Sequence, residues 1–153
     1  MTATETNDSS LKDANVELVQ RMIQAINQQD MTAMAEVLHE EAALEMPYTP
    51  APFPRVTTSR DAIIEFISSV PGWLEPENLH DVRIETYAST PNELVAEYKS
   101  STRVKASGMP YANEYVVRIS VRDGKIIRFA EYYNPIPLII ALGGTVELPE
   151  AAV

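Results

Sequence analysis

Apolar residues in the first half of the chain recur at steps of three and four, which is the spacing of amphipathic helices. A first helix is predicted from about Asp13 to Gln28, and its apolar face consists of Val16, Val19, Met22, Ile23 and Ile26. A second helix is predicted to begin after the capping residue Asp30. A third is predicted to begin near Thr58 or Ser59 and to end at Pro71-Gly72.

Beyond these helices the period of the pattern changes to two, which is typical of half-buried strands. Long strands are predicted over about 80–85, 94–104, 114–122 and 125–133, with Asp123-Gly124 as a hairpin turn, and a short strand over 42–46. Four prolines in 47–54 predict an extended loop. Helices first and an antiparallel meander afterwards indicate an α+β fold. We expect a curved antiparallel sheet wrapped around three helices, forming a cone with one pocket.

The two ends of the chain differ from this pattern. Residues 1–12 are polar and predict a disordered tail, so that 13–153 would form a single domain. The apolar segment 136–142 must be covered. It is expected either to close the pocket mouth as a lid or to pack against a second subunit. Val116, Ala130 and Tyr132 would be unusual on a solvated sheet face, which favours a homodimer.

Composition removes several classes of function. The formal charge of −10 and the absence of a basic stripe argue against nucleic acid as a partner. The chain has no cysteine and two histidines without ligand spacing, so no metal site is expected. No phosphate-binding glycine motif is present, and no cofactor is expected. The sequence shows neither a membrane span nor a signal peptide, which indicates a cytoplasmic protein.

Glu131 is the strongest candidate for chemistry. It alternates with Ile127, Phe129 and Tyr133, so this face of the strand is predicted to point inward. A carboxylate among apolar neighbours is desolvated, which raises its pKa and suits it to proton transfer near neutral pH. In the alternative register Ile126, Arg128, Ala130 and Tyr132 face the core and Glu131 is solvated.

Other polar side chains could orient a ligand or stabilise an oxyanion on the same inner face. These donors are Tyr115, Asn113, Tyr98, Ser100 and Tyr48. The tyrosines could equally be core residues with hydroxyls at the rim. Phe129, Tyr133, Trp73 and Met22 are expected to line the pocket. His80 leads the predicted inward set His80, Val82 and Ile84, either as a rim histidine or as a second acid/base group.

Two segments carry a family resemblance: 19–42, which ends in Leu38-His39-Glu40-Glu41-Ala42, and 123–134, which reads DGKIIRFAEYYN. Both resemble the SnoaL-like, or nuclear-transport-factor-2-like, superfamily. The segments GMPYANEY at 108–115 and EYYNP at 131–135 are similar to the phenazine-biosynthesis A/B proteins. That resemblance implies a dimeric, cofactor-free acid–base catalyst in which a glutamate at the position of Glu131 is the acid/base group.

Departures from the related enzymes limit what the resemblance implies. The ketosteroid-isomerase base position falls on Met46, and its tyrosine position falls on Met22. Met46-Pro47 and Arg60-Asp61-Ala62 also resemble the limonene-epoxide hydrolases. The arginine and aspartate positions of those enzymes fall on Tyr98 and Ser100, or on Lys99 and Ser101 one residue along, and neither register supplies the pair. The leading hypothesis is an isomerase, cyclase or dehydratase acting on a small, largely apolar cyclic or carbonyl compound. A non-catalytic binding module and an epoxide hydrolase with an altered acid/base set are the alternatives.

Overall fold

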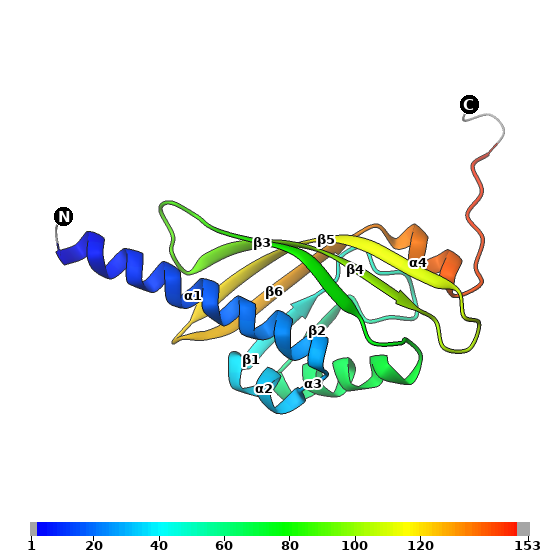
Figure 1. Ribbon diagram of the computed structural model, residues 1–153, viewed down its shortest axis with the longest axis horizontal. Helices are drawn as coiled ribbons and strands as arrows, with labels where there is room; N and C mark the ends of the chain where they lie inside the picture. The colour runs from blue at the N-terminus through cyan, green and yellow to red at the C-terminus, as the bar shows by residue number, and fades with distance from the viewer. Residues whose placement is uncertain (1–2, 150–153) are drawn as a thin grey trace.

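A long helix, α1 (Ala3–Gln28), crosses one face of a curved six-stranded sheet in the computed structural model (Figure 1). The structure describes residues 3–149, with side chains from residue 8 onward. Helices α2 (Met31–Val37) and α3 (Arg60–Ser69) lie on the same side, and a 3-10 turn, η1 (Val70–Gly72), follows α3. The strands are β1 (Leu38–Glu45), β2 (Val56–Thr58), β3 (Asn78–Thr86), β4 (Glu93–Arg103), β5 (Pro110–Arg122) and β6 (Lys125–Tyr133). A short helix, α4 (Pro135–Ala141), ends the fold. This is the predicted α+β architecture.

The predicted cap Asp30, and Ser59 rather than Thr58, set where two helices begin. The Asp30 carboxylate accepts a hydrogen bond from the backbone N–H of Ala33 at 2.9 Å, and α2 starts at the next residue. The Ser59 hydroxyl does the same for Ala62 at 3.3 Å at the start of α3. Each side chain satisfies a backbone donor that the first helical turn leaves without a partner. Both boundaries are therefore local consequences of the sequence.

The sheet has the strand order β2-β1-β6-β5-β4-β3. The β3–β4, β4–β5 and β5–β6 pairs form the predicted antiparallel meander. The prediction of a wholly antiparallel sheet is wrong at one place, because β1 pairs in parallel with β6. The chain leaves β1, forms β2 and α3, and returns through the meander, so β6 reaches the free edge of β1 in the same direction. The resulting mixed sheet curves around the helices and faces them with its buried side chains.

The N-terminal segment also differs from the prediction. Residues 3–12, predicted as a disordered tail, continue α1. The segment contains neither glycine nor proline to end the helix. Lys12 forms an i,i+4 ion pair with Asp8 at 3.0 Å and donates a hydrogen bond to the carbonyl of Ala88 at 3.3 Å. Within 3–149, no helix is both long and apolar enough to cross a membrane.

Candidate active site

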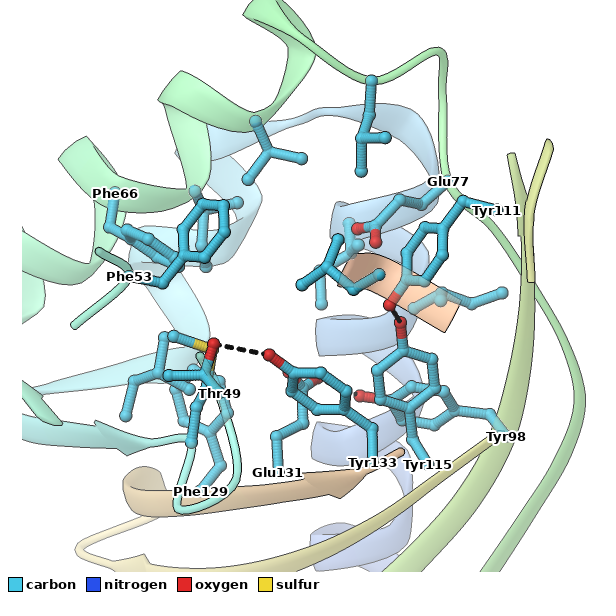
Figure 2. Close-up of a pocket in the computed structure, with 18 of the residues that line it drawn as sticks. Thr49, Phe53, Phe66, Glu77, Tyr98, Tyr111, Tyr115, Phe129, Glu131 and Tyr133 are labelled. Carbon is cyan, nitrogen blue, oxygen red and sulfur yellow. Dashed lines mark hydrogen bonds between the residues drawn. The ribbon is translucent and has the colours of Figure 1, made fainter. Parts of the chain in front are cut away.

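A cavity of about 110 Å³ lies between the concave face of the sheet and the helices (Figure 2). Strands β4, β5 and β6 supply most of its polar side chains. The rest of the lining comes from β1, β3, the helices α1, α3 and α4, the turn η1 and two loops. Its lining is mostly apolar and aromatic, and consists of Ile26, Leu44, Met46, Thr49, Phe53, Phe66, Ile67, Val70, Trp73, Leu74, Glu77, Leu79, Tyr98, Tyr111, Tyr115, Phe129, Glu131, Tyr133 and Leu138. A concave, mainly apolar space with a few convergent polar groups is the usual form of a small-molecule site.

Glu131 points into this cavity, so the predicted inward register of its strand is confirmed for Phe129, Glu131 and Tyr133. It is wrong at Ile127, because the pairing with β5 shifts there and Ile126 is the fully buried residue. The Tyr98 hydroxyl on β4 donates a hydrogen bond to Glu131 Oε1 at 2.7 Å. Desolvation raises the pKa of the Glu131 carboxyl, and the Tyr98 hydrogen bond opposes this by stabilising the carboxylate. The net direction is upward, as expected for a group that exchanges protons near neutral pH.

Two more tyrosines of the cavity are joined by their hydroxyl groups. The Tyr111 and Tyr115 oxygens lie 2.9 Å apart, and either can donate to the other (Figure 2). The Asn113 amide donates to the Tyr111 oxygen at 3.1 Å, and the Ser100 hydroxyl donates to the Tyr115 oxygen at 3.3 Å. The two tyrosines together have two hydroxyl protons, and only one of these is needed for the hydrogen bond between their oxygens. The other proton is available to a ligand.

These hydroxyls stay protonated under ordinary conditions. Burial raises the pKa of Tyr111 to about 12. Burial also raises the pKa values of Tyr98 and Tyr115 well above the ordinary tyrosine value, and the nearby Glu131 carboxylate adds to the effect. The tyrosines therefore act as hydrogen-bond donors rather than as bases. An oxyanion that develops in the cavity would find such a donor already in place.

Glu77 is a second carboxylate in the cavity, and sequence reasoning missed it. It lies in the loop between η1 and β3, and its side chain reaches toward Tyr111 (Figure 2). Burial raises its pKa to about 7, and the charge of Glu131 contributes. Because Glu77 belongs to no periodic segment, hydrophobic patterning could not place it. The only local signal was an acid between Pro76 and the buried Leu79.

The proline-rich segment forms one wall of the cavity. The Tyr133 hydroxyl donates to Thr49 Oγ1 at 2.6 Å, which leaves the Thr49 proton free for another acceptor. Phe53 packs on Trp73 with 5.5 Å between ring centroids. Neither Thr49 nor Phe53 was singled out in the sequence, because a segment with four prolines has no period from which to infer an inner face.

Several predicted pocket residues lie elsewhere. Met22 is fully buried in the core, and its helix reaches the cavity through Ile26 instead. Ser100 and Asn113 are buried but lie behind the tyrosines, which they hold by hydrogen bonds. Tyr48 is 58% exposed and packs edge-on against Tyr132. Among the five predicted donors, Tyr98 and Tyr115 line the cavity.

The inward direction predicted for His80 is wrong. Leu79 occupies the inner position of β3, opposite Ser100 of β4, and lines the cavity. The His80 side chain is 39% exposed and lies 3.6 Å from the carboxylate of Asp81. The register then shifts between His80 and Arg83, and Asp81 has a positive φ of 53°. Such a bulge reverses which alternate residues face inward, and a simple alternation cannot reveal it.

The charge balance of the cavity is one-sided. Its lining has two carboxylates and, within the described part of the chain, no lysine, arginine or histidine. The same part of the chain contains no group of three or more histidine, aspartate or glutamate side chains placed to hold a metal ion. The candidate chemistry of this cavity therefore rests on the carboxyl and hydroxyl groups described above.

The family model of the SnoaL-like domain matches residues 19–129, which include most of the cavity. The chain belongs to the SnoaL-like family. The uncharacterized protein YesE of Bacillus subtilis is 28% identical over 129 residues, which is 84% of this chain and 87% of YesE. The uncharacterized PhzA/B-like protein PA3332 of Pseudomonas aeruginosa is 25% identical over 128 residues, 84% of this chain and 89% of PA3332.

Solved structures agree with this assignment. A Bacillus subtilis protein provisionally described as an isomerase is 26% identical, with a TM-score of 0.79 over 87% of this chain and 95% of that one. A phenazine biosynthesis-related protein of Pseudomonas aeruginosa, PhzB2, has 20% identity and the same TM-score of 0.79, over 95% of each chain. The predicted superfamily is therefore confirmed, together with the distant relationship to the PhzA/B-like proteins. The family's members differ in activity, so the site itself must indicate the reaction.

Proposed function

We propose that this SnoaL-like protein is a cofactor-free acid–base catalyst that acts on a small, largely apolar carbonyl compound. The observation that carries the proposal is the 2.7 Å hydrogen bond from Tyr98 to Glu131 inside an apolar cavity. It holds one carboxylate oxygen in place and leaves the second oxygen free. A desolvated carboxylate with a raised pKa is a suitable general base.

The proposed reaction begins with a C–H bond next to the carbonyl group. The Glu131 carboxylate takes the proton, and the electron pair of the broken bond moves onto the carbonyl oxygen. The spare hydroxyl proton of the Tyr111–Tyr115 pair, or that of Thr49, donates a hydrogen bond to this developing oxyanion. Protonated Glu131 then returns its proton to carbon. Return at another carbon isomerises the compound, whereas loss of a leaving group gives elimination.

Deuterium exchange tests this proposal without a known substrate. The protein is incubated in D₂O with a panel of small cyclic ketones and enones, and loss of the α-proton signals is followed by NMR. We expect catalysed exchange that falls by about 100-fold or more in Glu131→Gln. Glu114→Gln is the matched control, because this exposed glutamate lies on the outer face of β5. Exchange that is equal in Glu131→Gln and the unaltered protein would contradict the proposal.

A binding module without turnover is the second candidate. It is favoured by the way the polar groups bond to one another: Tyr133 to Thr49, Tyr98 to Glu131, and Tyr111 to Tyr115. For such a module, Glu131→Gln should bind ligands as tightly as the unaltered protein, and no compound should be converted. The epoxide hydrolase hypothesis has less support, because Ser100 lies behind Tyr115 and does not line the cavity.

A homodimer is proposed from the outer face of the sheet. Val116 is 44% exposed and Tyr48 is 58% exposed, and Tyr132 packs on Tyr48 beside them. Adjacent exposed apolar side chains on a sheet face are typical of a protein interface. A second copy of the same chain is the proposed occupant of this face.

A further inference from the structure

Glu77 and Glu131 place two acidic groups around one aromatic cavity, and neither is neutralised by a basic side chain. Tyr98 gives Glu131 a hydrogen bond. None of the described side chains gives Glu77 a hydrogen bond or an ion pair. The Glu77 side chain is partly buried, and its carboxyl group points into the cavity (Figure 2). A carboxyl group that faces an apolar cavity and has no protein partner is available to a cationic ligand.

The surroundings of Glu77 extend this acidic character to a second hollow beside the cavity. That hollow shares Ile26, Ile67, Val70 and Glu77 with the cavity, and Glu75 lines its outer part. Glu77 thus lies in the wall between the two spaces. In both linings, as far as the described residues go, the charged groups are Glu75, Glu77 and Glu131. The other polar side chains there are uncharged: Ser68 of α3 and Gln29, which follows α1.

The aromatic rings of the cavity suit the same kind of ligand. Tyr98 and Tyr115 pack with centroids 5.3 Å apart, and Tyr115 and Tyr133 with centroids 5.6 Å apart. Phe53 and Trp73 form a second aromatic pair in the lining. The faces of such rings attract cations, most strongly where water is excluded. Aromatic walls and a free carboxylate together favour an organic ammonium group and disfavour an anion.

We propose that the cavity selects a small compound with a protonated amine, whose ammonium group pairs with Glu77. This rests on the proposed function and adds the class of substrate: an amine-bearing carbonyl compound. Glu77 recognises the nitrogen, and Glu131 with Tyr98 remains free to move the proton. Free carboxylates and phosphates are excluded by the same two acids.

The pH dependence of binding follows from this arrangement. Glu77 titrates near pH 7, and it faces Glu131 on β6, Tyr98 on β4, and Tyr111 and Tyr115 on β5, with Glu75 in its own loop. An ammonium ligand pairs with the ionised form of Glu77. Its affinity should therefore rise between pH 5.5 and pH 8 and then become constant. A neutral ligand of the same shape should not show this rise.

The test compares three probes of one shape: benzylamine, benzyl alcohol and benzoate. Binding is measured by calorimetry at pH 8, and the fluorescence of Trp73, the chain's one tryptophan, gives a second readout inside the cavity. We expect benzylamine to bind about tenfold or more tightly than benzyl alcohol, because a hydrogen bond to a charged partner outweighs a neutral one. Benzoate should not bind detectably.

Variants test whether Glu77 is the residue that binds the ammonium group. Glu77→Gln should weaken benzylamine about tenfold and leave benzyl alcohol unchanged, which also shows that the cavity is intact. Glu85→Gln, an exposed site on β3, is the control and should change neither affinity. Three results would overturn the proposal: equal affinities for the three probes, failure of benzylamine to bind, or no effect of Glu77→Gln on benzylamine binding. Charge preference requires no turnover, so this result is independent of the deuterium-exchange test of Glu131.

Discussion

The hydroxyl of Tyr98 on β4 donates a 2.7 Å hydrogen bond to the carboxylate of Glu131 on β6, across the intervening strand β5. The contact exists because the sheet curves and brings the concave faces of strands that are not neighbours close together. It fixes one carboxylate oxygen and leaves the other directed to the cavity. Much of the proposed chemistry depends on this pair.

Removing the Tyr98 hydroxyl should reduce proton transfer. In Tyr98→Phe the Glu131 carboxylate loses its donor, and a hydrogen bond to a charged group is worth about 1.5–3 kcal/mol, or roughly 10- to 100-fold in rate. The pKa of Glu131 should rise further, because the Tyr98 bond lowers it. Deuterium exchange and NMR titration measure the two effects. Tyr48→Phe is the control, since Tyr48 lies outside the cavity, and equal losses in both variants would contradict this role.

The two cavity carboxyls should make stability fall as pH rises. Both have folded-state pKa values above the unfolded value, so the folded protein binds more protons than the unfolded chain. Their contribution is therefore most favourable below about pH 4.5, and for Glu77 it is lost between there and about pH 7. Glu77→Gln should raise the unfolding free energy at pH 8 by roughly 1–3 kcal/mol. Urea unfolding at pH 5 and pH 8 checks this, and destabilisation of Glu77→Gln at pH 8 would refute it.

Asn27 should matter for stability although it lies outside the cavity. Its side-chain amide donates to the carbonyl of Leu79 at 3.0 Å, and its oxygen accepts from the N–H of Leu79 at 2.8 Å. These two bonds join α1 to the start of β3 just after the Glu77 loop. Asn27→Ala leaves both partly buried backbone groups without partners, at a cost of about 2–3 kcal/mol. Chemical unfolding should show this loss of stability for Asn27→Ala and almost no loss for Gln24→Ala, which changes an exposed residue of α1. Similar losses in both variants would argue against a stabilising role for the Asn27–Leu79 hydrogen bonds.

The Arg128–Glu45 pair should contribute a smaller, opposite pH dependence. Arg128 donates two hydrogen bonds to the Glu45 carboxylate, at 2.7 and 2.6 Å, which join β6 to β1. The pair lowers the pKa of Glu45, so its stabilisation is present above the ordinary glutamate pKa and is lost as pH falls through the folded value. Glu45→Gln should cost about 1 kcal/mol or less at pH 7, because both side chains are partly solvated. A loss at pH 7 that persists undiminished at pH 3 would contradict this account.

The proposed homodimer can be tested by mass. Light scattering should give twice the chain mass of 17.0 kDa. Val116→Lys should shift the mass toward the monomer, since it places a charge in the proposed apolar interface. Lys125→Glu, near the opposite end of the sheet, is a charge-changing control. A monomeric mass for the unaltered chain would rule the dimer out.

The periodic pattern of the sequence predicted which residues of the strands face inward. The alternation in β4 and β5 placed Tyr98 and Tyr115 on the inner face, and the apolar neighbours of Glu131 placed it in the cavity. These assignments succeeded because one face of each strand is buried, which fixes the register. The predicted cap Asp30 fixed the start of α2 for a similarly local reason, and the start predicted for α3 near Thr58 or Ser59 lies next to the observed one at Arg60.

Features that depend on tertiary structure could not be predicted from the sequence. Glu77 and Thr49 reach the cavity from loops whose path is set by the elements around them. His80 was misplaced because a bulge at Asp81 shifts the register. The parallel pairing of β1 with β6 needs a contact between residues that are over 80 positions apart. In each case the deciding interaction is absent from the local pattern.

The pKa of the Glu131 carboxyl is the measurement that tests the central claim most directly. Side-chain labelling and NMR titration give it in the unliganded protein, with Glu131→Gln to assign the signal. The account predicts a value clearly above the ordinary glutamate value of about 4.3, further raised in Tyr98→Phe. A value at or below the ordinary one, unaffected by Tyr98→Phe, would place Glu131 in water and contradict its role as the base of an apolar cavity.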